Sequence, residues 1–296
     1  MFLDAIRYMY RRGKFKTPVW LGLGEKQCGL ASKELPFVSI VIPTRDRLDL
    51  LKTCLDSILN LTAYPNFEVV VLDNDSVEPS TLSYLSNPGD ERVKVFKSPG
   101  PFNYSRIMNR GVNQTLGDVI CVMNNDTVVT KSQWLTNMVN HLDDTSVGVV
   151  GALLTYPSGL IQHAGIALGY TGAAGHVYSG LPISSIPTKD CFEVSAVTFA
   201  CAVIKRANWQ KVKGLDERYK VGLNDVDFCL RLRAVGLSAV VCKSTELIHL
   251  ESQSRQSVMS LKGFVRAATE VQRFTRVRRR ELKADSYFVF ETDSAD

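Results

Sequence analysis

Residues 38–76 read VSIVIPTRDRLDLLKTCLDSILNLTAYPNFEVVVLDNDS, and this stretch decides the fold. Two short apolar runs, Val38–Ile42 and Glu68–Leu72, flank a segment whose leucine and isoleucine side chains recur at helical spacing. The two runs begin about 30 residues apart, which is the length of a strand–helix–strand unit. Apolar runs without alternation are typical of strands that are buried on both faces. We therefore predict a parallel sheet that is covered by helices.

The same alternation continues outward along the chain. We predict strands over Arg92–Phe96, Val119–Met123, Val147–Leu154, Ser195–Ile204 and Ala239–Cys242, and helices over 104–115, Trp134–Leu142, Ala207–Val212 and Asp225–Ala234. Residues 155–192 are rich in Gly, Ser and Pro and are predicted to form a loop-rich insertion. Alternating strands and helices predict an α/β domain.

Both ends of the sequence are basic. Residues 1–16 carry five Arg or Lys against one Asp, and they are predicted to form a short amphipathic helix. A second basic helix is predicted over Leu261–Lys283. It could lie on an anionic membrane surface or pack on the domain or on a partner subunit, and the sequence leaves both interpretations open. The predicted organisation is an N-terminal extension (1–36), one α/β domain (37–258) and a C-terminal helix and tail (259–296).

The composition excludes several classes of protein. The 296 residues include 35 Lys or Arg and 30 Asp or Glu, and the net charge of +5 is too small to indicate nucleic-acid binding. No run of 18 apolar residues is present, and the first 20 residues are not typical of a secretory signal. The seven cysteines include no CxxC pair, so we expect reduced thiols and a cytoplasmic protein.

Three polar clusters follow predicted strands: Pro43-Thr-Arg-Asp46, Asp73-Asn-Asp-Ser76 and Asn124-Asn-Asp126. Ligands of open α/β sheets bind beyond the carboxyl ends of the strands, so these clusters predict a binding site. Neither GxGxxG nor GxxxxGK[ST] is present, which argues against a dinucleotide enzyme and a P-loop NTPase. HExxH and GxSxG are absent as well.

Seven segments between residue 38 and about residue 255 carry a family resemblance. They are VSIVIPTRDR, VVVLDNDS, FNYSRIMNRGV, GDVICVMNNDTVV, GLDERY, NDVDFCLRLRAVG and HLESQSR. In this order they resemble the family 2 glycosyltransferases, which are inverting enzymes of the GT-A fold. The resemblance implies a mixed, mainly parallel sheet flanked by helices. The segment that contains FNYSR is similar to enzymes that build bacterial surface polysaccharides such as O-antigen, a part of lipopolysaccharide.

The resemblance implies which residues contact the nucleotide-sugar donor. They are Pro43, Thr44, Arg45, Asp73, Asn74, Arg106, Asn109, Asn124 and Asn125. Two alternatives stay open from the residues themselves. Asp and Asn also close turns, and a polar helix face such as that of Arg106 and Asn109 is often only solvated.

The resemblance also implies a divalent metal site and a catalytic base. Asp126 and His249 would hold Mn²⁺ or Mg²⁺ between the phosphates of the donor, since hard ions prefer oxygen ligands. Asp225 would deprotonate the acceptor hydroxyl. Trp209, Asn224 and Asp227 would lie on the acceptor side. Alternatively, Asp225 and Asp227 are a helix N-terminal pair and Trp209 is a core residue.

The predicted function is the metal-dependent transfer of a hexose or deoxyhexose from a UDP, dTDP or GDP sugar to a hydroxyl group. The acceptor would be a glycan or lipid-linked glycan, at the cytoplasmic face of the inner membrane, with no nucleic acid as partner. Two alternatives are weighed against it. A sugar-phosphate nucleotidylyltransferase would carry a glycine-rich segment after the first strand, and PTRDR contains no Gly. An inactive glycan-binding or scaffolding subunit would not need both Asp126 and Asp225.

Overall fold

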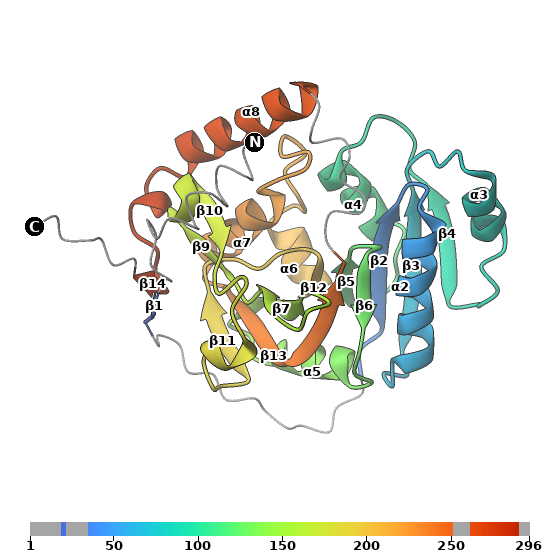
Figure 1. Ribbon diagram of the computed structural model, residues 1–296, viewed down its shortest axis with the longest axis horizontal. Coiled ribbons are helices and arrows are strands. Elements are labelled where there is room, and N and C mark those ends of the chain that lie inside the picture. The colour runs from blue at the N-terminus through green and yellow to red at the C-terminus, as the bar shows by residue number, and fades with distance from the viewer. Residues whose placement is uncertain (1–18, 22–34, 251–260, 290–296) are drawn as a thin grey trace, which may run out of the picture.

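The computed structural model describes residues 19–21, 35–250 and 261–289. Its centre is a mixed sheet of ten strands (Figure 1). In sheet order, eight of them are β11 (Cys191–Val194), β13 (Ser238–His249), β7 (Val147–Thr155), β12 (Cys201–Lys205), β5 (Val119–Met123), β2 (Val38–Thr44), β3 (Phe67–Asp73) and β4 (Val93–Lys97). Two short strands complete it, because β6 (Thr127–Val129) pairs with β13 and β8 (Ile161–His163) pairs with β7.

The direction of the strands divides the sheet into two halves. β5, β2, β3 and β4 are parallel to one another, as the apolar runs in the sequence predict. β13 and β7 are parallel in the other half. β12 lies between the halves and is antiparallel to both of its neighbours, β5 and β7. The predicted mixed, mainly parallel sheet is therefore confirmed, with β12 as the seam between its halves.

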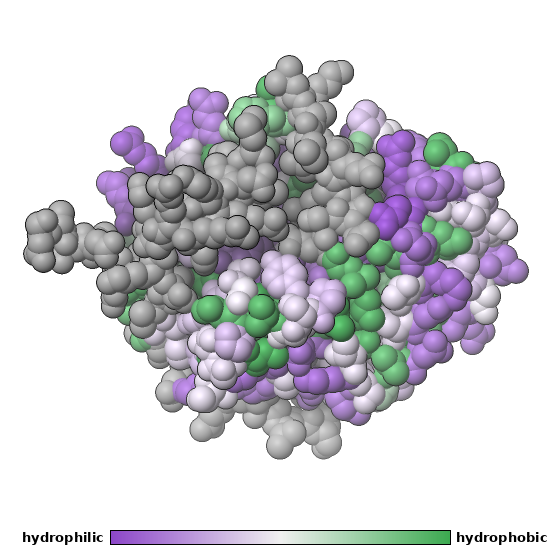
Figure 2. Space-filling model, viewed as in Figure 1, coloured by the Kyte–Doolittle hydropathy of each residue, from purple (hydrophilic) through white to green (hydrophobic). Residues whose placement is uncertain are grey.

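Helices cover both faces of the sheet. One core contains residues of α2 (Leu48–Leu61), α3 (Pro79–Ser86) and α5 (Trp134–His141). The other contains residues of α4 (Tyr104–Val112), α6 (Arg206–Lys211), α7 (Asn224–Ala234) and α8 (Leu261–Val277). Polar side chains dominate the surface over α2 and α3, at the right of Figure 2. Each face of the sheet is thus sealed from water by its own layer of helices.

The ends of two strands differ from the sequence prediction. β2 continues through Pro43 to Thr44, and it can do so because its pairing with β5 ends at Val41. The missing N–H of Pro43 therefore costs no bond to β5. β13 runs on to His249, well past the predicted end at Cys242, and a register shift lies between Cys242 and Glu246.

The insertion and the segment after it also differ from the prediction. The insertion contains β8, β9 (Ile166–Leu168) and β10 (Ala174–His176), and β9 pairs with β10. The strand predicted over Ser195–Ile204 is shorter, because β12 begins only at Cys201. Residues 195–200 are irregular apart from a bridge between Ala196 and Ile166, and they carry three residues that line the cavity described below.

The C-terminal segment packs on the domain. Phe274 of α8 is fully buried, and the carboxylate of Glu270 accepts hydrogen bonds from the backbone N–H of Lys220 (2.8 Å) and Gly222 (2.9 Å). A last strand, β14 (Phe288–Val289), pairs with β1 (Val19–Trp20). The predicted helix ends earlier than expected, at Val277. The helix predicted over 1–16 lies outside the described residues.

Part of α8 remains exposed. Phe264 and Val265 are 55% and 56% exposed, and a hydrophobic patch shows over α8 at the upper edge of Figure 2.

Within the described ranges, the helices are too short or too polar to cross a bilayer. The six described cysteines are buried and free.

Candidate active site

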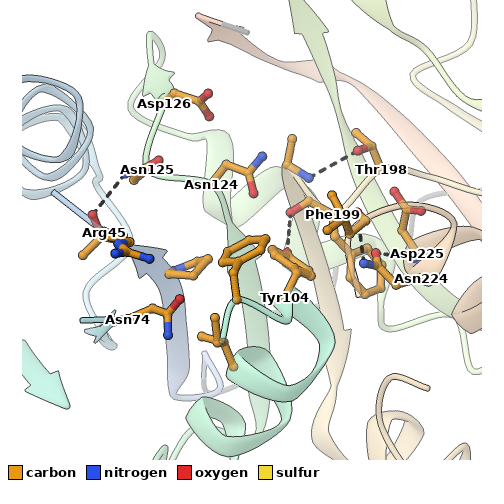
Figure 3. Close-up of a pocket in the computed structure, with 16 residues that line it drawn as sticks. Arg45, Asn74, Tyr104, Asn124, Asn125, Asp126, Thr198, Phe199, Asn224 and Asp225 are labelled. Atoms are coloured by element: carbon orange, nitrogen blue, oxygen red, sulfur yellow. Dashed lines mark hydrogen bonds between the residues drawn. The ribbon is translucent and has the colours of Figure 1, made fainter. Parts of the chain in front are cut away.

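A cavity of about 320 Å³ opens at the carboxyl ends of β2, β3 and β5, where the three polar clusters of the sequence meet. Figure 3 shows Arg45, Asn74 and Asn125 on one side of it and Asn224 and Asp225 on the other. Its lining consists of Pro43, Thr44, Arg45, Asn74, Phe102, Tyr104, Ile107, Asn124, Asn125, Asp126, Thr198, Phe199, Ala200, Val221, Asn224 and Asp225. Nine of the predicted site residues are among them.

The ends of β2 and β5 are tied together on the cavity wall. The side-chain amide of Asn125 donates to the hydroxyl of Thr44 at 3.1 Å, and both residues are buried. Arg45 follows Thr44 and is exposed, and it lines the cavity rather than the core. This arrangement offers a cation and polar groups to an anionic ligand.

Asn74, at the end of β3, presents a buried acceptor to the cavity. Its amide nitrogen donates to the carbonyls of Ser98 (2.8 Å) and Gly100 (2.9 Å). Its Oδ1 is buried and has no hydrogen-bond partner among the described residues. A buried acceptor without a partner is costly, so this oxygen is suited to an N–H group of a ligand. Asp73 does not line the cavity. It closes the turn instead, by accepting from the N–H of Ser76 at 2.9 Å.

Asp126 and His249 form a buried pair at the edge of the cavity. Each residue is 5% exposed, and Asp126 Oδ1 lies 3.0 Å from Nε2 of His249. The other ring nitrogen, Nδ1, lies 2.8 Å from Nε2 of Gln162 on β8. A carboxylate and an imidazole that meet beside a cavity are ligands that Mn²⁺ accepts, so these residues fit the predicted metal site.

Asp225 is the first-turn carboxylate of α7 that faces the cavity. It is half-buried, and its carboxylate accepts a hydrogen bond from the backbone N–H of Val226 at 2.8 Å. Burial raises the pKa of Asp225 above the ordinary value, although the polar groups of Val226, Phe199 and Thr198 beside the carboxylate act in the opposite direction. A carboxylate with a raised pKa is a stronger base than an exposed one, which suits proton abstraction.

The aromatic side chains of Phe102 and Tyr104 also line the cavity. The hydroxyl of Tyr104 donates to the carbonyl of Phe199 at 3.2 Å, and burial raises the pKa of Tyr104 far above the ordinary value. Phe102 is 42% exposed at the rim. Sequence reasoning missed these two residues as well as Thr198 and Phe199. The FNYSR segment contained a signal for Phe102 and Tyr104, whereas Thr198 and Phe199 were hidden in an expected strand.

Besides Asp73 and His249, four predicted site residues do not line the cavity. Arg106 donates to the carbonyl of Pro101, and Asn109 exchanges hydrogen bonds with the backbone of Leu215 at 2.8 and 2.9 Å. Trp209 packs on Phe228 with ring centroids 5.1 Å apart. Asp227 is buried and bonds Nε of Arg231 and Nη2 of Arg278, each at 2.7 Å. For Trp209 and Asp227 the structural alternatives describe these contacts well.

A second group of ligand-type side chains lies away from the cavity. It consists of His141, Asp190 and Cys242, whose ligand atoms are within 4.8 Å of one another. None of the three lines the cavity. His141 Nε2 and Asp190 Oδ2 are 3.4 Å apart, and the Cys242 thiol contacts the hydroxyls of Ser244 and Thr245 at 3.3 Å. These contacts within the protein explain why the three side chains lie close together.

Comparison with known proteins shows the family to which the chain is similar. The model of the family described as Glycosyl transferase family 2 matches residues 39–209, more than half of the chain. An O-antigen biosynthesis protein, RfbC of Myxococcus xanthus, is 40% identical over 227 residues, which are 75% of this chain and 18% of that protein. The uncharacterized protein y4gI of Sinorhizobium fredii (strain NBRC 101917 / NGR234) is 44% identical over 227 residues, 74% of this chain and 25% of that protein. The chain thus spans a quarter or less of the length of these relatives.

Two solved structures are similar in fold. The mannosyltransferase PcManGT from Pyrobaculum calidifontis, in complex with GDP-Man and Mn²⁺, aligns with a TM-score of 0.61 at 16% identity and covers 94% of this chain and 73% of its own. The structure of GalNAc-T7 with UDP, GalNAc and Mn²⁺ aligns with a TM-score of 0.66 at 16% identity and covers 83% of this chain and 48% of its own. The fold is therefore the GT-A fold that the sequence predicted.

Proposed function

Since the chain belongs to glycosyltransferase family 2, we propose that it transfers a sugar from a nucleotide-sugar to a hydroxyl group, with inversion at the anomeric carbon. The observation that carries this proposal is the cavity itself. It has the buried Asp126–His249 pair at its edge and the raised-pKa carboxylate of Asp225 in its opposite wall. The pair is suited to a donor diphosphate, and Asp225 is suited to an acceptor hydroxyl.

The donor end is proposed to be the wall that β2, β3 and β5 build. The free Oδ1 of Asn74 would accept a hydrogen bond from an N–H of the nucleobase, and Arg45 would face the charged diphosphate. Asp126 and His249 would hold Mn²⁺ or Mg²⁺. Because one of the two ligands is an imidazole, Mn²⁺ is the better match. When bound, the cation would offset the charge of the leaving diphosphate.

Asp225 is proposed to act as the general base. Its carboxylate takes the proton of the acceptor hydroxyl while the hydroxyl oxygen attacks the anomeric carbon of the donor sugar. The bond from that carbon to the diphosphate oxygen breaks, and its electron pair leaves with the nucleoside diphosphate. The hydrogen bond from the backbone N–H of Val226 helps to hold the carboxylate in place, so that less reorganisation is needed during transfer.

The acceptor is proposed to be a glycan or lipid-linked glycan of a bacterial surface polysaccharide. The support is the 40% identity to the O-antigen biosynthesis protein of Myxococcus xanthus. A lipid-linked acceptor would bring the enzyme to a membrane surface. The exposed Phe264 and Val265, beside the basic Arg266 on α8, are suited to such a peripheral contact at the cytoplasmic face.

The test is nucleotide binding followed by donor hydrolysis. Thermal unfolding is measured with UDP, GDP and dTDP, each with and without Mn²⁺, because a ligand that binds the folded state raises the melting temperature. We expect one nucleotide to stabilise the protein only with the metal, and Asp126→Ala to abolish that effect while the unliganded protein still unfolds cooperatively. The matching nucleotide-sugar should then be hydrolysed slowly. If no nucleotide stabilises the protein and no donor is hydrolysed, the inactive scaffolding alternative takes the place of this proposal.

A further inference from the structure

Strand β8 of the insertion places Gln162 next to His249 of β13. Gln162 is 6% exposed, and its amide nitrogen lies 2.8 Å from Nδ1 of His249. Its other amide atom, Oε1, is buried and has no hydrogen-bond partner among the described residues. Gln162 does not line the cavity, and its side-chain amide hydrogen-bonds the imidazole of His249. Its one observed role is therefore toward His249.

The contacts define the tautomer of His249. Nε2 lies 3.0 Å from the carboxylate of Asp126, and a carboxylate can only accept, so Nε2 carries a proton. On the other side of the ring an amide N–H points at Nδ1, so Nδ1 offers its lone pair. In this arrangement His249 cannot ligate a cation, because Nε2, the nitrogen that faces Asp126, has no free lone pair.

A cation between Asp126 and His249 requires the opposite tautomer. Nε2 must then present its lone pair, and the ring proton must sit on Nδ1. The N–H at Nδ1 needs an acceptor in a buried place. Half a turn of the Gln162 amide supplies one, because it exchanges Nε2 of that side chain for the unpartnered Oε1. Ligating histidines generally donate their second ring N–H in this way, which fixes the ring and strengthens the metal bond.

We propose that Gln162 is a positioning residue that serves both tautomers of His249: its amide N–H stabilises the metal-free ring, and its amide oxygen stabilises the metal-ligating ring. The inference rests on the proposed metal site at Asp126 and His249 and adds the residue that makes this site switchable. An amide is uncharged and can donate or accept at one position, whereas Leu does neither and an ionised Glu can only accept, so neither can replace Gln162 in both states.

The first measurement is Mn²⁺ affinity, read from the loss of the free-ion EPR signal with Mn²⁺ alone as the probe. We expect Gln162→Leu to weaken binding on the order of 10–100-fold. Gln162→Glu should retain binding, since a carboxylate still accepts from Nδ1–H. The matched control is Gln210→Leu, at an exposed glutamine of α6 that does not line the cavity, and it should bind as the wild type does. Melting curves of all variants establish that each one is folded.

The second measurement is the tautomer of His249 by ¹H–¹⁵N correlation spectra of the ring nitrogens, with His249→Gln for assignment. We expect the Nε2–H form without metal and the Nδ1–H form with diamagnetic Zn²⁺. If the wild type shows the Nδ1–H form without metal, or if Gln162→Leu binds Mn²⁺ like the wild type, the role of Gln162 is refuted. If Asp126→Ala and His249→Ala also leave Mn²⁺ binding unchanged, the proposed metal site itself fails.

Discussion

At the scale of single residues, Asp225 links catalysis to stability. Burial raises the pKa of its carboxyl group in the folded protein, so the ionised form costs folding free energy at neutral pH. The group stabilises the folded state below the ordinary pKa of an aspartate, and this contribution is lost as the pH rises through the folded-state pKa. The active form of the base is therefore the less stable form of the protein.

We predict that Asp225→Asn lowers the transfer rate by roughly 10²–10⁴-fold, because it removes the general base. The same variant should be more stable than the wild type at pH 7.5, and the gain should vanish at pH 3, where Asp225 is protonated. Transfer kinetics and urea unfolding at the two pH values check both effects. Near-wild-type turnover would remove Asp225 from the role of base.

Asp227→Asn, two residues further along α7, is the matched variant. We predict that it loses stability and that its turnover falls less than that of Asp225→Asn. Asp227 is 3% exposed and pairs with Arg231 and Arg278. Removing its charge leaves the Arg231 guanidinium without its carboxylate partner and Arg278 with Glu281 alone, which should cost on the order of 3 kcal/mol of unfolding free energy. The loss of turnover at 25 °C should be smaller than for Asp225→Asn. A larger loss would assign the base to Asp227.

Sequence reasoning located single residues well where they follow a strand end and less well elsewhere. Thr44, Asn74 and Asn125 line the cavity because the end of a parallel strand fixes where they lie. Asp227 and Trp209 were expected near the acceptor. Their orientation depends on Arg278 and Phe228, which come from distant parts of the chain, and no local pattern reveals such contacts.

At the scale of elements, α8 acts on the loop that leads into α7. The Glu270 carboxylate accepts from the N–H groups of Lys220 and Gly222, and Val221 between them lines the cavity. The helix is also part of the domain itself, because its Phe274 is fully buried in the core.

We predict that Glu270→Ala weakens acceptor use and leaves nucleotide binding nearly unchanged. Both N–H groups lose their acceptor, so the loop before Asn224 and Asp225 is held less firmly. KM for the acceptor should rise several-fold, while the nucleotide-dependent shift in melting temperature stays the same. The control is Glu281→Ala, which removes a carboxylate from the same segment that bonds Arg278 and not the loop. Equal effects of the two variants would contradict a specific role of Glu270.

The hydrophobic pattern of the sequence predicts some strand boundaries and misses others. The pattern located β5 because its residues are apolar and buried throughout. It ended β13 at Cys242, because Lys243, Ser244, Thr245 and Glu246 interrupt the apolar run at the register shift. His249 therefore looked like a loop residue after a short strand. The three-residue strands β8, β9 and β10 are too short for any periodicity to detect, and β8 carries Gln162.

At the scale of the whole molecule, one end of α8 is the surface suited to a membrane. We predict that the double change of Phe264 and Val265 to Ser lowers co-sedimentation with anionic vesicles at low salt and leaves transfer to a soluble acceptor unchanged. The matched control is Val277→Ser, at the other end of the same helix and 54% exposed. Added salt should weaken binding of the wild type, since part of the attraction is ionic. If the wild type does not co-sediment at low salt, the membrane contact is refuted.

The antiparallel strand β12, which separates the two halves of the sheet, has a consequence for recombination between genes of such enzymes. The strands on one side of it come from one continuous stretch, β2 to β5, which ends at the residues proposed for the donor. Apart from the short β6, the strands on the other side lie in a later stretch, β7 to β13, which contains Asp225. Under the proposed function, a single crossover between genes in the region of α5 would join the nucleotide-contacting strands of one enzyme, with Asp126, to the later strands of another, which carry Asp225 and His249. Nucleotide preference and acceptor preference could in this way be recombined as separate traits.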